Sequence, residues 1–122
     1  DEEAMMITGA LTIKEAAGIL LKKTKAVFAI TLGKDGTLLG MNNTIKIIPS
    51  IKVTPVDTTG AGDAFTGAVL YQLSDYSVRE MRSLADTGWE MIITNGNKAG
   101  ARTCEYMGAM EAFSHLSNSI FK

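Results

Sequence analysis

VDTTGAGDAF, residues 56–65, places two threonines, a Gly-Ala-Gly turn and one acid between an apolar segment and a helix-like apolar pattern. Gly60 and Gly62 admit backbone conformations that are closed to other residues, and Ala61 adds almost no bulk. At such a helix start, successive N–H groups point at one spot, where the positive end of the helix dipole also favours negative charge. The stretch therefore predicts an anion hole that fits a phosphate or a transferring phosphoryl group.

Asp63, in the first turn of this predicted helix, has two interpretations. It can complement the helix dipole as a capping acid. It can also act as a general base that accepts a proton from a hydroxyl held opposite the phosphate. A bare Gly-x-Gly-Asp pattern favours the capping role, because short motifs often match by chance.

The composition describes one globular domain, with 122 residues, 46% apolar residues and a formal charge of −1. The absence of a basic stripe argues against a nucleic-acid partner. Apolar runs such as 26–30 are too short to cross a bilayer, and the acidic first residues do not resemble a signal peptide. One cysteine, Cys104, cannot form an internal disulfide, which favours the reducing cytoplasm, and one cysteine with one histidine excludes a zinc cluster.

Periodicity and turn residues predict an α/β protein without an internal repeat. Thr12 is the expected N-cap of the first helix, and Glu15 completes a capping box. The apolar run AVFAITL is typical of a strand covered on both faces. The predicted elements are, in order, a helix at 12–23, a strand at 26–32, a turn at 33–37, hairpin arms at 38–41 and 45–48 around Asn42-Asn43, and helices at 64–73, from 77 towards 101 and from 111 to 116.

Residues 57–68, DTTGAGDAFTGA, closely resemble the C-terminal signature of the PfkB, or ribokinase-like, carbohydrate kinases. Three further segments are similar to that family in order and spacing: DEEAMMITG (1–9), TLGKDGTLL (31–39) and GNKAGARTCEYMGAM (96–110). The resemblance covers almost the whole chain. The sequences that flank the signature, IPSIKV before it and GAVLYQL within and after its end, most resemble those of bacterial fructokinases.

This resemblance implies the C-terminal part of a ribokinase-like, three-layer α/β/α fold, over residues 1–122, with the family's N-terminal portion and lid absent. It implies an ATP-dependent kinase that phosphorylates a sugar hydroxyl, with fructose and fructose 6-phosphate as the expected pair. The alternatives are a kinase for ribose or 2-keto-3-deoxygluconate, or a noncatalytic nucleotide-binding or oligomerising remnant. A parallel sheet cut through its middle would expose an apolar edge and favour a homo-oligomer.

The resemblance also implies roles for individual residues. Asp63 becomes the base for the sugar's primary hydroxyl, and the N–H groups of Gly60, Ala61 and Gly62 hold the phosphoryl charge. Magnesium is oriented through water by Glu2 or Glu3. The residues expected around ATP are Thr31, Gly33 and Gly36 along the triphosphate, Asn97 beside the adenine, and Gly100 and Ala101 in the wall of its site.

A monovalent cation such as K⁺ beside the anion hole is a further implication. Its carbonyl donors map to Asp57, Thr59, Thr103, Tyr106 and Gly108, and Ala112 stands where the family usually has a hydroxyl. Outside these sites, Cys104 is expected to be a packing residue, since no histidine is near it in sequence. His115 is expected at the surface or rim.

Overall fold

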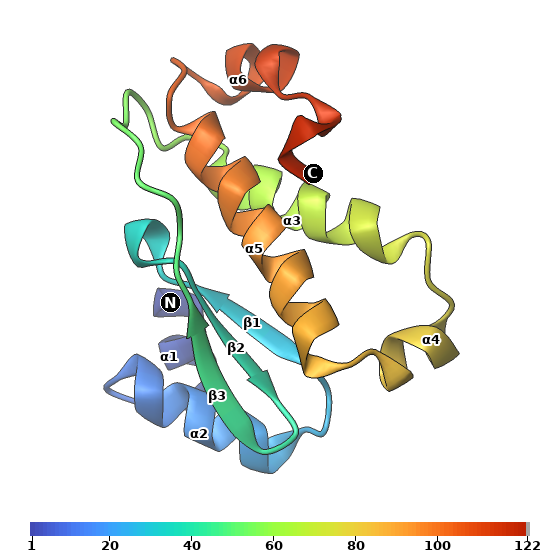
Figure 1. The fold of residues 1–122 in the computed structure, drawn as a ribbon. Coiled ribbons are helices and arrows are strands. Elements are labelled where there is room, and N and C mark those ends of the chain that lie inside the picture. Colours follow the sequence, from blue (N-terminus) through green and yellow to red (C-terminus); the bar gives the residue numbers. More distant parts are fainter. Residues whose placement is uncertain (122) are drawn as a thin grey trace.

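The chain folds into layers in which a three-stranded sheet separates two pairs of helices (Figure 1). The computed structural model describes residues 1–121. α1 (Glu2–Thr8) and α2 (Ile13–Lys23) cover one face of the sheet, and α3 (Ala61–Leu73) and α5 (Asp86–Thr103) cover the other. The remaining elements are β1 (Phe28–Thr31), η1 (Gly33–Asp35), β2 (Thr37–Met41), β3 (Thr44–Ile48), α4 (Val78–Ser83), α6 (Ala109–His115) and η2 (Asn118–Phe121).

The strands pair in the order β1-β2-β3, and both pairs are antiparallel. The parallel sheet expected from the resemblance is therefore wrong for these three strands. Their connections are too short for the crossover that a parallel pair needs. Asn42 and Asn43, with φ of 48° and 60°, form the turn between β2 and β3, as the hairpin prediction requires.

β2 is the central strand, and all five of its residues are buried. Leu39 and Met41 pack with Ile93 of α5, whereas Leu38 packs with Ala17 of α2. The strand predicted to be covered on both faces was β1, and this prediction is wrong, because β1 lies at the sheet edge with only Ile30 buried. Helix α5 lies over β2 and β3 with α3 packed against it, and the second face of β1 is left open.

Helix ends follow local capping chemistry where the sequence supplies it. Thr12 caps α2 by accepting a hydrogen bond from the Glu15 backbone N–H at 3.2 Å. The Glu15 carboxylate accepts from the Leu11 N–H rather than from Thr12, so only half of the predicted capping box forms. α1, for which no helix was predicted, begins at the Asp1 cap and ends at Gly9 in the left-handed conformation.

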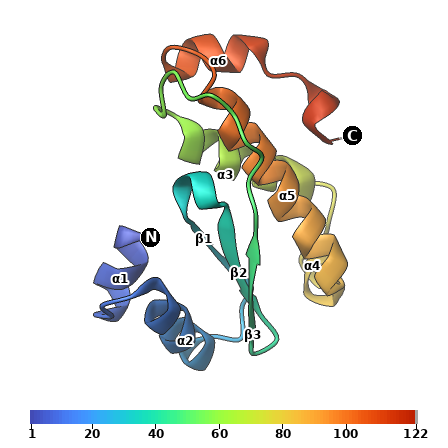
Figure 2. The same cartoon turned by 60° about the vertical axis from the view of Figure 1, so that its left-hand side comes forward.

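The helix expected from 77 towards 101 is two helices. A capping box between Ser77 and Glu80 starts α4, and the chain is extended at Leu84 and Ala85 before α5 begins. After the break, α5 runs alongside the strands of the sheet (Figure 2).

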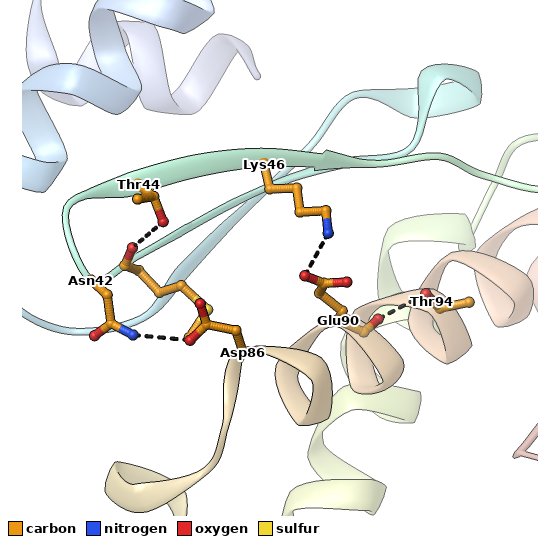
Figure 3. A network of polar contacts seen from close by, with 7 residues as sticks. Asn42, Thr44, Lys46, Asp86, Glu90 and Thr94 are labelled. Carbon is orange, nitrogen blue, oxygen red and sulfur yellow. Dashed lines mark hydrogen bonds and ion pairs between the residues drawn. The ribbon is translucent and has the colours of Figure 1, made fainter.

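Two exposed polar contacts join the hairpin to the start of α5 (Figure 3). The Asn42 side-chain amide donates to Asp86 at 3.0 Å, and the Lys46 ammonium lies 2.6 Å from Glu90. Exposed pairs of this kind contribute at most about 1 kcal/mol. The apolar cluster beneath them, against which Trp89 packs, is therefore the main attachment of β3 to α5.

Within residues 1–121, no single helix is both long and apolar enough to cross a membrane. Only α1 and α2 taken together, across a 54° bend, satisfy that test by length and composition.

Candidate functional site

The Gly-Ala-Gly turn lies at the N-terminus of α3, as the sequence predicts. Gly60 is the N-cap with φ of 81°, a left-handed conformation, and a Cβ on Gly60 would overlap the Ala109 side chain. Asp63 is the third residue of the helix, and its side chain is exposed. Glycine at position 60 is thus required by backbone geometry and by the closeness of α6.

The N–H groups at this helix start differ in their availability. Ala61 N–H donates to the Thr58 carbonyl at 3.2 Å within the turn. In the part of the chain that the structure describes, the N–H groups of Gly60 and Gly62 donate to no protein acceptor. Two of the three expected donors are therefore free, beside the positive end of a 13-residue helix.

Small residues let α3 and α5 approach closely. A Cβ on Gly100 would lie 3.0 Å from the Ala61 carbonyl, and one on Gly96 would lie 2.8 Å from the Phe65 ring. Gly100 packs against Ala61, the first residue of α3. Gly100 is expected in the wall of the adenine site together with Ala101, which is half-buried. The start of α3 is therefore placed against the α5 backbone.

Asp57 ties the chain before α3 to the chain before α6. Its carboxylate accepts from the Thr59 N–H at 2.9 Å and from the Gly108 N–H at 2.9 Å. Hydrogen bonds from Thr59, and then from Gly108, hold the pKa of Asp57 below its ordinary value of 3.8. Asp57, Thr59 and Gly108, all expected at the cation site, are thereby brought together.

The expected cation donors are partly used inside the protein. The Thr103 carbonyl accepts from the Tyr106 N–H at 3.3 Å, and the Gly108 carbonyl accepts from the Ala112 N–H at 3.2 Å. Ala112 is fully buried and has no side-chain oxygen to offer. Among residues 1–121, no three His, Cys, Asp or Glu side chains gather where they could hold a metal ion. A cation here would rely on backbone carbonyls, each of which keeps a second lone pair.

The second glycine turn lies between β1 and β2. Gly33 and Gly36 have φ of 59° and 104°, and a Cβ on Gly36 would overlap the Ile48 carbonyl. Thr31 precedes this turn with its side chain exposed, and its carbonyl lies 3.2 Å from the backbone nitrogen of Asp1. The exposed Glu2 and Glu3 in the first turn of α1 therefore follow directly on a residue anchored beside the turn.

Asn97, expected beside the adenine, is buried and fully hydrogen-bonded. Its Nδ2 donates to the Ile48 carbonyl at 2.9 Å and to the Pro49 carbonyl at 3.3 Å, and its Oδ1 accepts from the Thr37 hydroxyl at 2.6 Å. Sequence reasoning missed Thr37. The available signal was a hydroxyl residue leading an otherwise apolar strand.

Cys104 and His115 have the structural roles expected of them. Cys104 is half-buried, its thiol donates to the Gly100 carbonyl at 3.3 Å, and burial together with the charge of Asp57 raises its pKa. Such a thiol is a poor nucleophile. His115 is exposed, stacks on Tyr106 at 4.6 Å and lies 3.0 Å from Glu111.

α5 brings the two glycine turns to the same end of the molecule. Asn97 holds the end of β3 beside Gly36, and Gly100, one turn further along, contacts Ala61 at the start of α3. Around the two turns, the protein offers free backbone N–H groups, the positive end of the α3 dipole and the exposed carboxylate of Asp63. That combination suits a polyphosphate and a proton transfer.

Comparison with known proteins gives a consistent result. The sequence profile described as pfkB family carbohydrate kinase matches residues 1–116. The chain is 35% identical over 103 residues to the ribokinase of Staphylococcus aureus, covering 84% of this chain and 31% of the relative. It is 35% identical over 111 residues to the aminoimidazole riboside kinase of Salmonella typhimurium, covering 91% and 33%.

Solved structures share the fold. The fructokinase of Vibrio cholerae, solved with fructose, ADP and a calcium ion, superposes with a TM-score of 0.77 at 31% identity, over 91% of this chain and 35% of that one. The aminoimidazole riboside kinase of Salmonella enterica, complexed with aminoimidazole riboside and an ATP analogue, gives 0.78 at 33% identity, over 91% and 36%. The chain thus spans about a third of the length of the relatives it matches.

Proposed function

Because the chain belongs to the pfkB family of carbohydrate kinases, we propose that it provides the phosphate-binding turn and the general base of an ATP-dependent sugar kinase, as the C-terminal portion of such an enzyme. The observation that carries this proposal is the start of α3, where Gly60 and Gly62 leave their N–H groups free and the side chain of Asp63, the residue after Gly62, is exposed.

In the proposed reaction, Asp63 accepts the proton of a sugar hydroxyl. The hydroxyl oxygen of the sugar attacks the terminal phosphorus of ATP, and ADP is the leaving group. Gly60 and Gly62 donate N–H groups to the transferring phosphoryl oxygens, where negative charge accumulates. Ala61 contributes less, since its N–H is shared with Thr58. The turn at Gly33 and Gly36 would line the remaining phosphates.

Metal ions belong to this proposal at two places. Magnesium, which neutralises phosphate charge when bound, would be held through water by Glu2 or Glu3. A potassium ion would sit among the carbonyls of the two segments that the Asp57 carboxylate joins, 57–59 and 103–108. The charge of Asp57 and the carbonyl oxygens suit a hard monovalent cation, although Ala112 supplies no ligand.

We propose fructose as the sugar. The structural similarity to the Vibrio cholerae fructokinase and the sequences that flank the signature support this choice. The similarity to ribokinases and to an aminoimidazole riboside kinase makes ribose and other ribosides the first alternatives. A cytoplasmic location and self-association through an open sheet edge complete the proposal. The edges are those of β1 and of β3, whose Ile45 and Ile47 are exposed.

Asp63→Asn in the natural polypeptide that contains these residues tests the proposal. The substitution keeps the shape and the backbone donors, but removes the proton acceptor. We expect sugar phosphorylation to fall about 100- to 10,000-fold, while ATP affinity measured by calorimetry stays within a few-fold. Full activity in the variant would return Asp63 to the role of a helix-capping acid. ATP binding without phosphorylation of any sugar by the parent would favour a noncatalytic nucleotide-binding role.

A further inference from the structure

A buried polar junction joins α5 to the start of β2 and to the end of β3. Thr37, at the start of β2, is 0% exposed, and Asn97 of α5 is 6% exposed. The Asn97 side chain takes a hydrogen bond from Thr37 and gives two to the chain leaving β3, at Ile48 and Pro49. Three segments far apart in sequence therefore meet on one amide group.

The amide of Asn97 has no donor left for a ligand. Its nitrogen donates to two backbone carbonyls, one for each N–H group that it has, and its oxygen accepts from Thr37. Each partner is buried or part-buried, so breaking one bond leaves a polar atom without compensation from water. Asn97 therefore acts on its surroundings by holding them in place.

The junction lies between the two glycine turns. Thr37 directly follows Gly36, whose backbone packs against the Ile48 carbonyl that Asn97 also binds. Gly100 lies three residues after Asn97, on the same side of the helix and about 4.5 Å further along its axis. Gly100 faces the Ala61 carbonyl at the start of α3, which a Cβ on Gly100 would approach to 3.0 Å. One side of α5 thus sets where both turns lie.

We propose that Thr37, acting through Asn97, is a positioning residue that aligns the Gly33–Gly36 turn with the Gly60–Asp63 turn for one polyphosphate. The proposal rests on the proposed nucleotide binding for its consequence, but its geometric content can be measured without nucleotide. Both side chains are buried and hydrogen-bonded within the protein, so the proposed effect is on the placement of the turns and not on direct contact with the phosphate.

Thr37→Val tests the proposal, because valine has nearly the same shape but lacks the hydroxyl. Thr37→Ser restores the hydroxyl, and Ile93→Val is the matched control. Ile93 lies one turn before Asn97 on α5 and packs on the same sheet face without a polar contact. The readouts are the amide NMR shifts of Gly33, Gly36, Gly60 and Gly62, and the affinity for MgATP by calorimetry, at a temperature where every variant is folded.

We expect Thr37→Val to move the amide signals of both turns and to weaken MgATP binding about tenfold, as loss of one buried hydrogen bond would allow. Thr37→Ser should return both readouts to within about twofold of the parent, and Ile93→Val should move neither. Should Thr37→Val not fold, Thr37→Ala, which leaves room for water beside Asn97, serves the same comparison.

The proposal is overturned if Thr37→Val moves the turns no more than Ile93→Val does, or if Thr37→Ser behaves like Thr37→Val. A parent chain that binds no MgATP would refute the proposed function instead. In that case the amide shifts alone still decide whether Thr37 aligns the two turns.

Discussion

Gly60→Ala and Gly62→Ala add the same methyl group two residues apart, and we expect them to change stability in opposite directions. Gly60 has φ of 81°, and its added Cβ would overlap Ala109. Gly62 lies in the first turn of α3 without a positive φ, and no heavy atom of the described chain outside its immediate neighbourhood lies within 4 Å of its added Cβ.

The magnitudes follow from these two environments. Alanine in the left-handed region costs about 1–2 kcal/mol, and overpacking against a neighbour costs about 1–3 kcal/mol more. The reduced freedom of the unfolded chain returns about 0.4–1 kcal/mol. We therefore expect Gly60→Ala to lose about 1–5 kcal/mol of unfolding free energy. Gly62→Ala should gain up to about 1 kcal/mol from helix propensity.

Urea unfolding and MgATP calorimetry on both variants separate stability from binding. Gly62→Ala should be at least as stable as the parent but bind MgATP about tenfold more weakly or worse, because its methyl occupies the space proposed for the phosphoryl group. Parent-like affinity in Gly62→Ala would show that the phosphate does not bind at this turn. A Gly60→Ala variant as stable as the parent would refute the argument from the left-handed backbone.

Three further predictions concern polar and ionisable groups. The lowered pKa of Asp57 means that its stabilising contribution is complete above the ordinary value of 3.8 and is lost as pH falls through the folded-state value; urea melts between pH 2 and 7 should show a shallower acid loss in Asp57→Asn than in the parent. The raised pKa of Cys104 should make it react with iodoacetamide at pH 8 more slowly than in the unfolded chain. Asp57→Asn should speed that reaction, and an unchanged rate would contradict the electrostatic cause. Gln72→Leu leaves the buried Asn95 amide without the acceptor it now has at 2.7 Å, and should cost about 1–3 kcal/mol in urea unfolding unless water reaches Asn95.

Local chemistry explains which parts of the fold could be predicted. The Asn42-Asn43 hairpin and the start of α3 at Gly60 depend on backbone conformations that few residues adopt, so their sequences are informative. The Thr12 cap is equally local. An acidic first turn and Gly9 at its end are local signals for α1 as well.

The features that could not be predicted depend on contacts between residues that are distant in sequence. No glycine or proline marks the break at Leu84 and Ala85, which arises where α5 turns to lie on the sheet. Burial of β2 rather than β1 depends on which strand the helices cover. At the site, the turn at Gly33–Gly36 and the start of a helix at the Gly-Ala-Gly turn could be predicted, whereas the pairing of Thr37 with Asn97 spans 60 positions and has no local pattern.

The central place of β2 has a consequence for the order of folding. Its two partners are joined to it by the five residues 32–36 and the two residues 42–43, so both pairings close short loops. α3 and α5 must be brought in from much further along the chain, which is slower. We expect the three-stranded meander to form first, with Leu38 and Leu39 bare on opposite faces. During that interval it can add strands from other chains, so refolding yield should fall steeply with protein concentration.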